Sequence, residues 1–211
     1  MLESCEFDHM RLTAILIAIN TGFYMILAYL SHDLLRINDY WMHIFGFSKN
    51  MFLNGSYWQV LTSMFAHFHL SHLGFNMVFL AFFGVKGEKI YGKKCFLFIY
   101  FSCGLLSIFP AFLYSPNSVS AGASGAIFGL TGACLIALRN QYSGGVYTAL
   151  MFGFLFFILS SATGFLSHLV GILTGFLIGG LITRDWYREE KINEEISGDK
   201  ISFIEDPKNF K

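Results

Sequence analysis

The sequence predicts an all-α polytopic membrane protein with six transmembrane helices, and three observations support this. First, 55% of the 211 residues are hydrophobic and only 13% are charged, with a mean hydropathy of +0.55, which is far from the balance of a soluble domain. Second, residues 95–138 and 140–183 lack Asp, Glu, Lys and Arg, and each stretch is long enough for two crossings of about 20 residues. Third, the alternation typical of membrane barrel strands is absent, so helices must satisfy the backbone groups in lipid.

The uncharged stretches define the elements in order. We expect one membrane domain over residues 1–183 and a polar tail over 184–211. Within the domain, the expected spans are about 12–30, 70–86, 94–114, 124–139, 145–160 and 166–183, with an outer loop over 31–69.

The basic residues near the ends of the spans predict the orientation. They follow the second, fourth and sixth spans: Lys86, Lys89, Lys93, Lys94, Arg139, Arg184 and Arg188. Because Lys and Arg in short loops stay in the cytoplasm, we expect a multi-pass protein of the cell membrane with both termini cytoplasmic. Fourteen Lys and Arg balance fourteen Asp and Glu, so the charge indicates no nucleic acid partner, and the lipid bilayer is the expected surrounding.

Polar side chains inside the predicted spans mark a candidate site, because such residues are costly in lipid and are mostly functional. His72 lies in the second span, Ser124 opens the fourth and His168 opens the sixth. At 1.5 Å per residue, they lie roughly 21, 22 and 24 Å from the basic residues at the cytoplasmic ends of their helices. Three helices therefore place a polar residue at one depth, about 6 to 9 Å below the outer boundary of the hydrocarbon core.

A serine and a histidine at one depth are the minimum for a nucleophile and its general base. We expect Ser124 to attack a peptide carbonyl and His168 to accept its proton. No Asp or Glu lies in a predicted span, which excludes an intramembrane Ser-His-Asp triad and an aspartyl protease. The oxyanion donors are expected to be the Ser124 backbone N–H, the His72 ring and the Asn76 amide, the last two on one helix face. This chemistry needs no cofactor and no metal.

Small-residue faces follow both candidate catalytic residues, with glycines spaced four apart: Gly125 and Gly129 in the fourth span, and Gly171, Gly175 and Gly179 in the sixth. Such faces let membrane helices pack closely, so we expect Ser124 and His168 to meet. Phe128, one turn beyond Ser124, is then expected to pack on the imidazole and hold its plane.

Three motifs occur in a fixed order on the second, fourth and sixth spans: His67-x4-His72-x3-Asn76, Gly122-x-Ser124-Gly125 and His168-x2-Gly171-x3-Gly175, with Glu88-Lys-Ile-Tyr-Gly92 after the second span. This combination resembles the rhomboid intramembrane serine proteases over roughly residues 58–179. The resemblance implies a rhomboid-like bundle whose short fourth helix carries the nucleophile, and a water-accessible cavity open to the outside. It also implies partners that are transmembrane-helix proteins, with single-span substrates cleaved near the outer ends of their helices.

By this resemblance Ser124 is the nucleophile, His168 the base, and His72 and Asn76 the oxyanion donors. The family often has Tyr where Phe128 stands, and many members have Arg where this chain has Gln59. These departures concern ring stacking and loop anchoring, and they touch neither the nucleophile nor the base. From its position, His67 is expected to buttress the loop where it enters the second helix.

Other classes of function remain open. A catalytically inactive relative would bind transmembrane helices without cutting them, although such proteins typically lack the serine or the histidine. A transporter or channel would usually need several acids or bases within its spans. The three histidines His67, His69 and His72 suggest a metal site, but no carboxylate or cysteine converges with them and His-Glu-x-x-His is absent, so we expect no metal.

Substrates are expected to enter past the fifth span. Gly153, the apolar run 154–159 and the small-residue turn at 160–165 form a weakly anchored, lipid-facing element. We therefore expect this element to be the gate.

Overall fold

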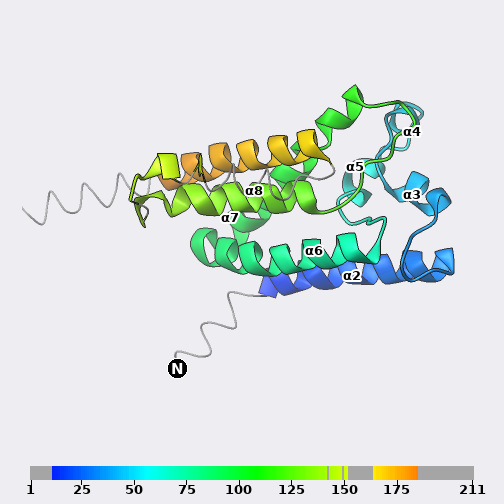
Figure 1. Ribbon diagram of the computed structural model, residues 1–211, viewed down its shortest axis with the longest axis horizontal. Helices are drawn as coiled ribbons and strands as arrows, with labels where there is room; N and C mark the ends of the chain where they lie inside the picture. Colours follow the sequence, from blue (N-terminus) through cyan, green and yellow to red (C-terminus); the bar gives the residue numbers. More distant parts are fainter. Residues whose placement is uncertain (1–10, 142, 149, 152–163, 185–211) are drawn as a thin grey trace, which may run out of the picture.

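The computed structural model describes residues 11–141, 143–148, 150–151 and 164–184. The long elements run side by side in Figure 1: α2 (Arg11–Ser31), α6 (Leu70–Phe79) with the π-helix η1 (Leu80–Gly84), α7 (Val85–Leu106), α8 (Ser124–Ala137) and the helix Phe165–Arg184. The short helices α3 (Asp39–Phe45), α4 (Lys49–Leu53) and α5 (Gln59–Thr62) gather at one end, and the 3-10 turns η2 (Phe109–Leu113) and η3 (Arg139–Gln141) follow α7 and α8. These described ranges contain no strands, only two isolated bridges, which confirms the predicted all-α fold.

Three described helical runs are long and apolar enough to cross a membrane: Leu12–Ser31, Leu70–Leu113 and Phe165–Arg184. The run Leu70–Leu113 has 44 residues, about 66 Å at 1.5 Å per residue and twice the thickness of a hydrocarbon core. It breaks at Gly92, where φ is 69° and ψ is 168°, and Figure 1 shows the chain returning toward the start of α6. The sequence predicted a loop between the spans 70–86 and 94–114. The helix instead continues to either side of one glycine, because glycine adopts a positive φ at little cost.

The expected fifth span falls largely outside the described residues. Residues 152–163, which include Gly153 and most of the proposed gate, are among those not described, and so is the tail from 185 onward. The gate and the position of the tail therefore remain predictions.

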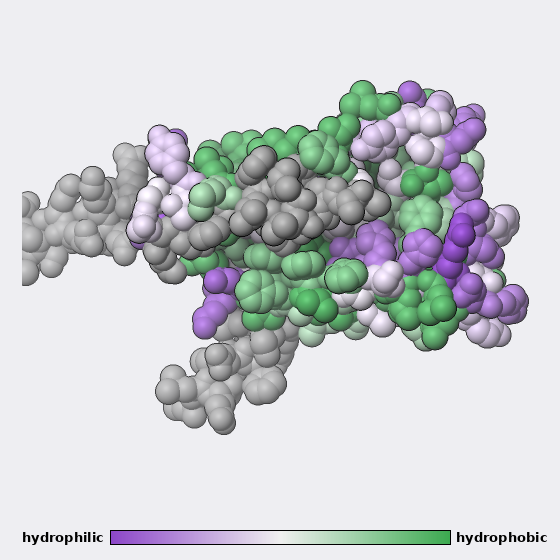
Figure 2. All heavy atoms as spheres, viewed as in Figure 1, coloured by the Kyte–Doolittle hydropathy of each residue, from purple (hydrophilic) through white to green (hydrophobic). Residues whose placement is uncertain are grey.

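The outer faces of the helices are apolar. Figure 2 shows hydrophobic side chains over the helix bodies, whereas hydrophilic ones gather around the end that holds α3, α4 and α5. Large exposed apolar side chains occur on α2, α6 and the helix Phe165–Arg184: Ile15, Ile19, Ile26, Phe75, Val78, Leu173, Leu177 and Leu181. A surface of this extent suits lipid and not water, so the chain is a polytopic membrane protein.

Helix α8 lies at the centre of the bundle. It has only 14 residues, about 21 Å, and nearly all its side chains are buried. Its glycines contact the helix Phe165–Arg184 directly: a Cβ on Gly175 would overlap the carbonyl oxygen of Gly129, and a Cβ on Gly171 would overlap that of Gly125. The predicted close approach of the two glycine faces is therefore confirmed, and it sets the distance between the candidate catalytic residues.

A buried carboxylate joins α7 to the start of α2. Glu88 is fully buried, and its oxygens accept hydrogen bonds from the backbone N–H of Leu12 (3.1 Å), the backbone N–H of Thr13 (2.9 Å) and the Thr13 hydroxyl (2.9 Å). The first N–H groups of a helix have no partner within the helix, so an acidic side chain there stabilises its start. This contact fixes α2 against α7.

Candidate active site

The turn before α8 positions Ser124. Gly122 has a φ of 127°, and a Cβ there would lie 2.8 Å from the His72 ring, so only glycine fits. The backbone N–H of Gly122 donates to the Ser63 carbonyl (2.8 Å), and that of Ala123 donates to His67 Nε2 (3.4 Å). Ala123, the residue before α8, makes no side-chain hydrogen bond that caps the helix, and the first N–H groups of a helix have no partner within the helix, so the Ser124 N–H is a candidate donor to a ligand.

His168 meets Ser124 from the neighbouring helix. His168 Nε2 and Ser124 Oγ lie 2.8 Å apart, joined by a hydrogen bond. The Phe128 ring stacks on the imidazole, with centroids 4.3 Å apart and planes at 13°. The His168 N–H also donates to the Gly164 carbonyl at 3.0 Å, which fixes the start of the helix. The glycine contacts thus bring together a hydroxyl and an imidazole in hydrogen-bonding geometry.

Two polar side chains of α6, His72 and Asn76, lie next to the turn at Gly122 that precedes Ser124. His72 Nε2 lies 3.1 Å and Asn76 Nδ2 lies 3.6 Å from the position that a Cβ on Gly122 would take. Asn76 is 6% exposed, and among the described residues its Nδ2 has no hydrogen-bond partner. An unpaired buried amide donor is costly, so this one suits an acceptor that arrives with a substrate.

His67 lies beneath this group and is bound to the backbone on both sides. Its Nδ1 lies 3.0 Å from the Phe65 carbonyl, which accepts its proton, and its Nε2 accepts from Ala123. Its ring also packs edge-on against His72, with centroids 5.1 Å apart. Burial, and secondarily His72, lowers the pKa of His67 to about 3, so the ring is neutral. Because both nitrogens are used, His67 is not free to bind a metal.

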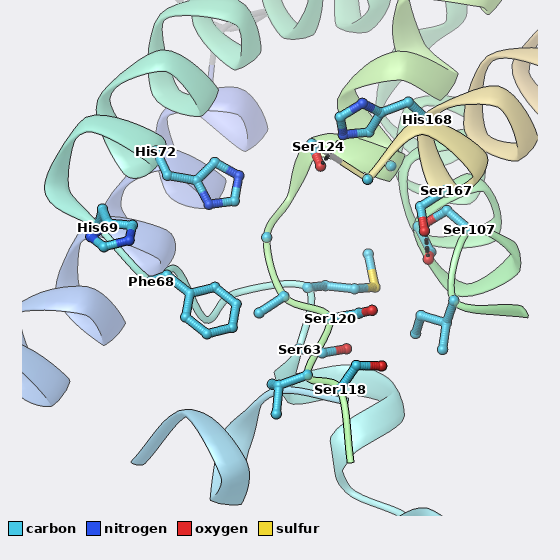
Figure 3. Close-up of a pocket in the computed structure, with 18 of the residues that line it drawn as sticks. Ser63, Phe68, His69, His72, Ser107, Ser118, Ser120, Ser124, Ser167 and His168 are labelled. Atoms are coloured by element: carbon cyan, nitrogen blue, oxygen red, sulfur yellow. Dashed lines mark hydrogen bonds between the residues drawn. The ribbon is translucent and has the colours of Figure 1, made fainter. Parts of the chain in front are cut away.

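A cavity of about 540 Å³ opens beside Ser124. Figure 3 shows Ser124 and His168 on one side of it, His72 and His69 across from them, and Ser63, Ser118 and Ser120 toward one end. Ser63 is 3% exposed, and its hydroxyl has no hydrogen-bond partner within the described ranges. Sequence reasoning missed these serines, because Ser63 lies far along the chain from Ser118 and Ser120, and none of the three lies on a helix whose spacing would reveal it.

The chain matches a known family and several known proteins. The Rhomboid domain family matches residues 54–185. The rhomboid protease GluP of Bacillus subtilis is 41% identical over 99 residues, 46% of this chain and 19% of GluP. The putative rhomboid protease YdcA of the same organism is 33% identical over 136 residues, 61% of this chain and 68% of YdcA.

The relatives also include a protein described as inactive. The inactive RHOMBOID-like protein 8 of Arabidopsis thaliana is 34% identical over 145 residues, 67% of this chain and 40% of that protein. The chain thus spans between about a fifth and two thirds of the length of these three relatives. The family match covers more than half of the chain and contains all the residues of the site described above. This chain belongs to the rhomboid family.

Proposed function

We propose that this chain is an intramembrane serine endopeptidase that cleaves single-span membrane proteins near the outer ends of their transmembrane helices. The observation that carries the proposal is the 2.8 Å contact between Ser124 Oγ and His168 Nε2 at the edge of a cavity. A hydroxyl hydrogen-bonded to an imidazole is the arrangement that activates a serine nucleophile.

In the acylation step, Ser124 Oγ forms a bond to the carbonyl carbon of the peptide while its proton moves to His168 Nε2. The C–N bond of the resulting tetrahedral adduct then breaks, and His168 returns the proton to the leaving amine. In the second step, a water oxygen forms a bond to the ester carbon while one water proton moves to His168 Nε2. The bond between that carbon and Ser124 Oγ then breaks, His168 returns the proton to Oγ, and the acid product leaves. Phe128 holds the plane of the imidazole through both steps.

The oxyanion of each adduct needs donors that are in place before the reaction. The donors around the turn at Gly122 are the Ser124 backbone N–H, the His72 ring and Asn76 Nδ2, which has no hydrogen-bond partner among the described residues. Preorganised donors of this kind act chiefly on the transition state. His67 supports them by holding the backbone of Ala123 next to the nucleophile.

The depth of the site follows from the orientation that we propose. Arg139 Nη1 donates to Thr183 Oγ1 at 3.2 Å, so the ends of α8 and of the last helix meet far from Ser124. With this basic end in the cytoplasm, Ser124 faces the outer leaflet. A substrate helix must unwind there, because helical backbone is internally bonded, and glycine near the scissile bond lowers that cost by about 1 kcal/mol relative to alanine.

The test uses the purified protein in liposomes with a panel of single-span substrates and mass spectrometry of the products. We expect cleavage in the outer third of the substrate helix, lost in both Ser124→Ala and His168→Ala. A serine-directed phosphonylating inhibitor should label Ser124 in a way that depends on His168. Substrate binding without cleavage in the wild type would instead identify an inactive relative, and cleavage in the cytoplasmic third would overturn the proposed depth.

A further inference from the structure

The side-chain amide of Gln59 is fully buried in the outer loop and binds three backbone groups of one turn. Its Nε2 donates to the carbonyls of His43 (2.6 Å) and Ile44 (3.3 Å), and its Oε1 accepts from the Ser48 N–H (3.1 Å). The two carbonyls belong to the last turn of α3, whose C=O groups have no partner within the helix. Gln59 therefore connects the last turn of α3 to Ser48, the residue just before α4.

The turn that Gln59 closes contains Phe47, and Phe47 is paired with the segment that carries the nucleophile. The Phe47 N–H donates to the Ser120 carbonyl (2.8 Å), and the Ser120 N–H donates to the Phe47 carbonyl (2.9 Å). A Cβ on Gly46 would lie 2.5 Å from the side-chain atom Val119 Cγ1 and 3.4 Å from the Ser120 carbonyl oxygen, so the turn packs tightly against this segment. The turn thus sets the position of Ser120.

Ser120 is linked to Ser124 by a short and restrained piece of backbone. Figure 3 shows Ser118 and Ser120 on the segment that leads to Ser124. Gly122 is bonded to the Ser63 carbonyl and lies against the His72 ring. The backbone between Ser120 and Ser124 is restrained and cannot easily absorb a displacement of Phe47. Such a displacement therefore also moves Ser124 relative to the neighbouring oxyanion donors.

We propose that Gln59 is a positioning residue for peptide cleavage, acting through the Phe47–Ser120 pair on the placement of Ser124. This inference rests on the proposed protease function. Gln59 is suited to the task because a carboxamide carries donors and an acceptor together. Glutamate would set a carboxylate against two carbonyl oxygens, and arginine would leave the Ser48 N–H without an acceptor.

The decisive variant is Gln59→Glu, measured by kcat and KM for a single-span substrate and by the rate at which a small phosphonylating inhibitor labels Ser124. We expect kcat and labelling to fall together by about 10- to 100-fold at neutral pH, because displacements of about 1 Å cost this much, while KM changes less than about threefold. The rate constant of labelling is measured on folded molecules alone, so its comparison between the variant and the wild type does not depend on the yield of folded protein.

The pH dependence separates positioning from simple loss of structure. A protonated carboxyl has one O–H donor and a carbonyl acceptor, so it restores the acceptor and one of the two donors of the amide. The ratio of Gln59→Glu to wild-type kcat should therefore rise as the pH falls and the introduced carboxyl becomes neutral. Gln59→Met, which is similar in length but has no polar group, should lower kcat without this recovery, and it also serves if Gln59→Glu does not fold.

A matched control for the Gln59 variants removes another buried side-chain amide, that of Asn20 in α2, which lies outside the outer loop. Asn20 is fully buried in α2, and its Nδ2 donates to the Leu16 carbonyl (2.8 Å). Asn20→Leu should lower the melting temperature but leave kcat and labelling per folded molecule within about twofold. Equal loss of kcat in Asn20→Leu and Gln59→Met, or an unchanged kcat in Gln59→Glu, would overturn the positioning role. A wild type that neither cleaves nor becomes labelled would overturn the protease function and this inference with it.

Discussion

The two sides of the site are held by different kinds of contact. On the side of His168, glycine backbones of α8 and of the helix Phe165–Arg184 touch, with no side chains between them. On the side of the outer loop, side chains of α5 and of Trp58, the residue before it, bind backbone carbonyls: Trp58 Nε1 and Gln59 Nε2 donate to Ile44, and Thr62 Oγ1 donates to Phe45 at 2.7 Å. Added volume is therefore the most damaging change in the first region, and the loss of hydrogen-bonding groups is the most damaging change in the second.

The largest expected effect comes from adding volume between the two helices. Gly175→Val should lower kcat/KM by more than about 100-fold, because a side chain there overlaps Gly129 and moves His168 away from Ser124. The measurement is cleavage of a single-span substrate together with inhibitor labelling of Ser124. Gly180→Val is the matched control in the same helix, since the nearest atom to its Cβ, Ile136 Cγ1, is 3.7 Å away. Similar rates in the two variants would contradict the glycine contact as the determinant.

Removing an oxyanion donor should have the next largest effect. Asn76→Ala is expected to lower kcat by about 10²- to 10³-fold with little change in KM, because the amide acts mainly in the transition state. Steady-state kinetics over a range of substrate densities in liposomes separates the two constants. Asn54→Ala, which removes an exposed side-chain amide whose hydrogen bonds among the described residues go to Asn50, should leave both constants unchanged. An Asn76→Ala loss confined to KM would assign the amide to substrate binding.

Weakening the ring stack should cost less. Phe128→Leu removes the aromatic face that lies on His168, and such contacts are worth about 0.5–1.5 kcal/mol, which corresponds to a fall in kcat of roughly 2- to 12-fold. Phe128→Tyr keeps the ring and should retain a rate close to that of the wild type. If the Leu and Tyr variants lose the same activity, the stacking does not orient the imidazole.

The smallest expected effect comes from deleting one hydrogen bond of the outer loop. Thr62→Val is nearly isosteric and removes the donor to Phe45, so it should lower the free energy of unfolding by about 1 kcal/mol. Trp58 and Gln59 still bind the end of α3, and kcat should therefore stay within about twofold. Thermal unfolding in detergent and the cleavage assay test the two parts separately. A large loss of kcat would show that no bond of this loop is redundant.

Helical spacing made the inner part of the site predictable. Ser124 and His168 were placed at one depth by counting residues along two helices, the glycines at intervals of four indicated the contact, and Phe128 followed from its distance of one turn. Each of these arguments uses local periodicity, which the bundle preserves. The polytopic helical fold was predictable for the same reason, since apolar stretches of sufficient length have few alternatives in lipid.

The outer loop and the ends of the helices were less predictable. Gln59 appeared only as a departure from a pattern, yet its amide anchors the loop through donors and an acceptor that arginine does not combine. Glu88 was expected after a span, in a basic loop, yet it is buried against Leu12 and Thr13, 76 and 75 residues away. Polar contacts between such distant positions depend on the assembled fold and leave no periodic signal in the sequence.

The size of the cavity has a consequence for the order of events in a catalytic cycle. A volume of about 540 Å³ corresponds to roughly 18 water molecules at about 30 Å³ each. In the proposed reaction, an unwound substrate segment displaces much of this water while its peptide bond is attacked. The water that hydrolyses the acyl-enzyme is then supplied most readily after the amine fragment has left and the cavity has refilled. Release of the first product would thereby become a step before deacylation, and lipids that slow the departure of that fragment would lengthen the lifetime of the ester on Ser124.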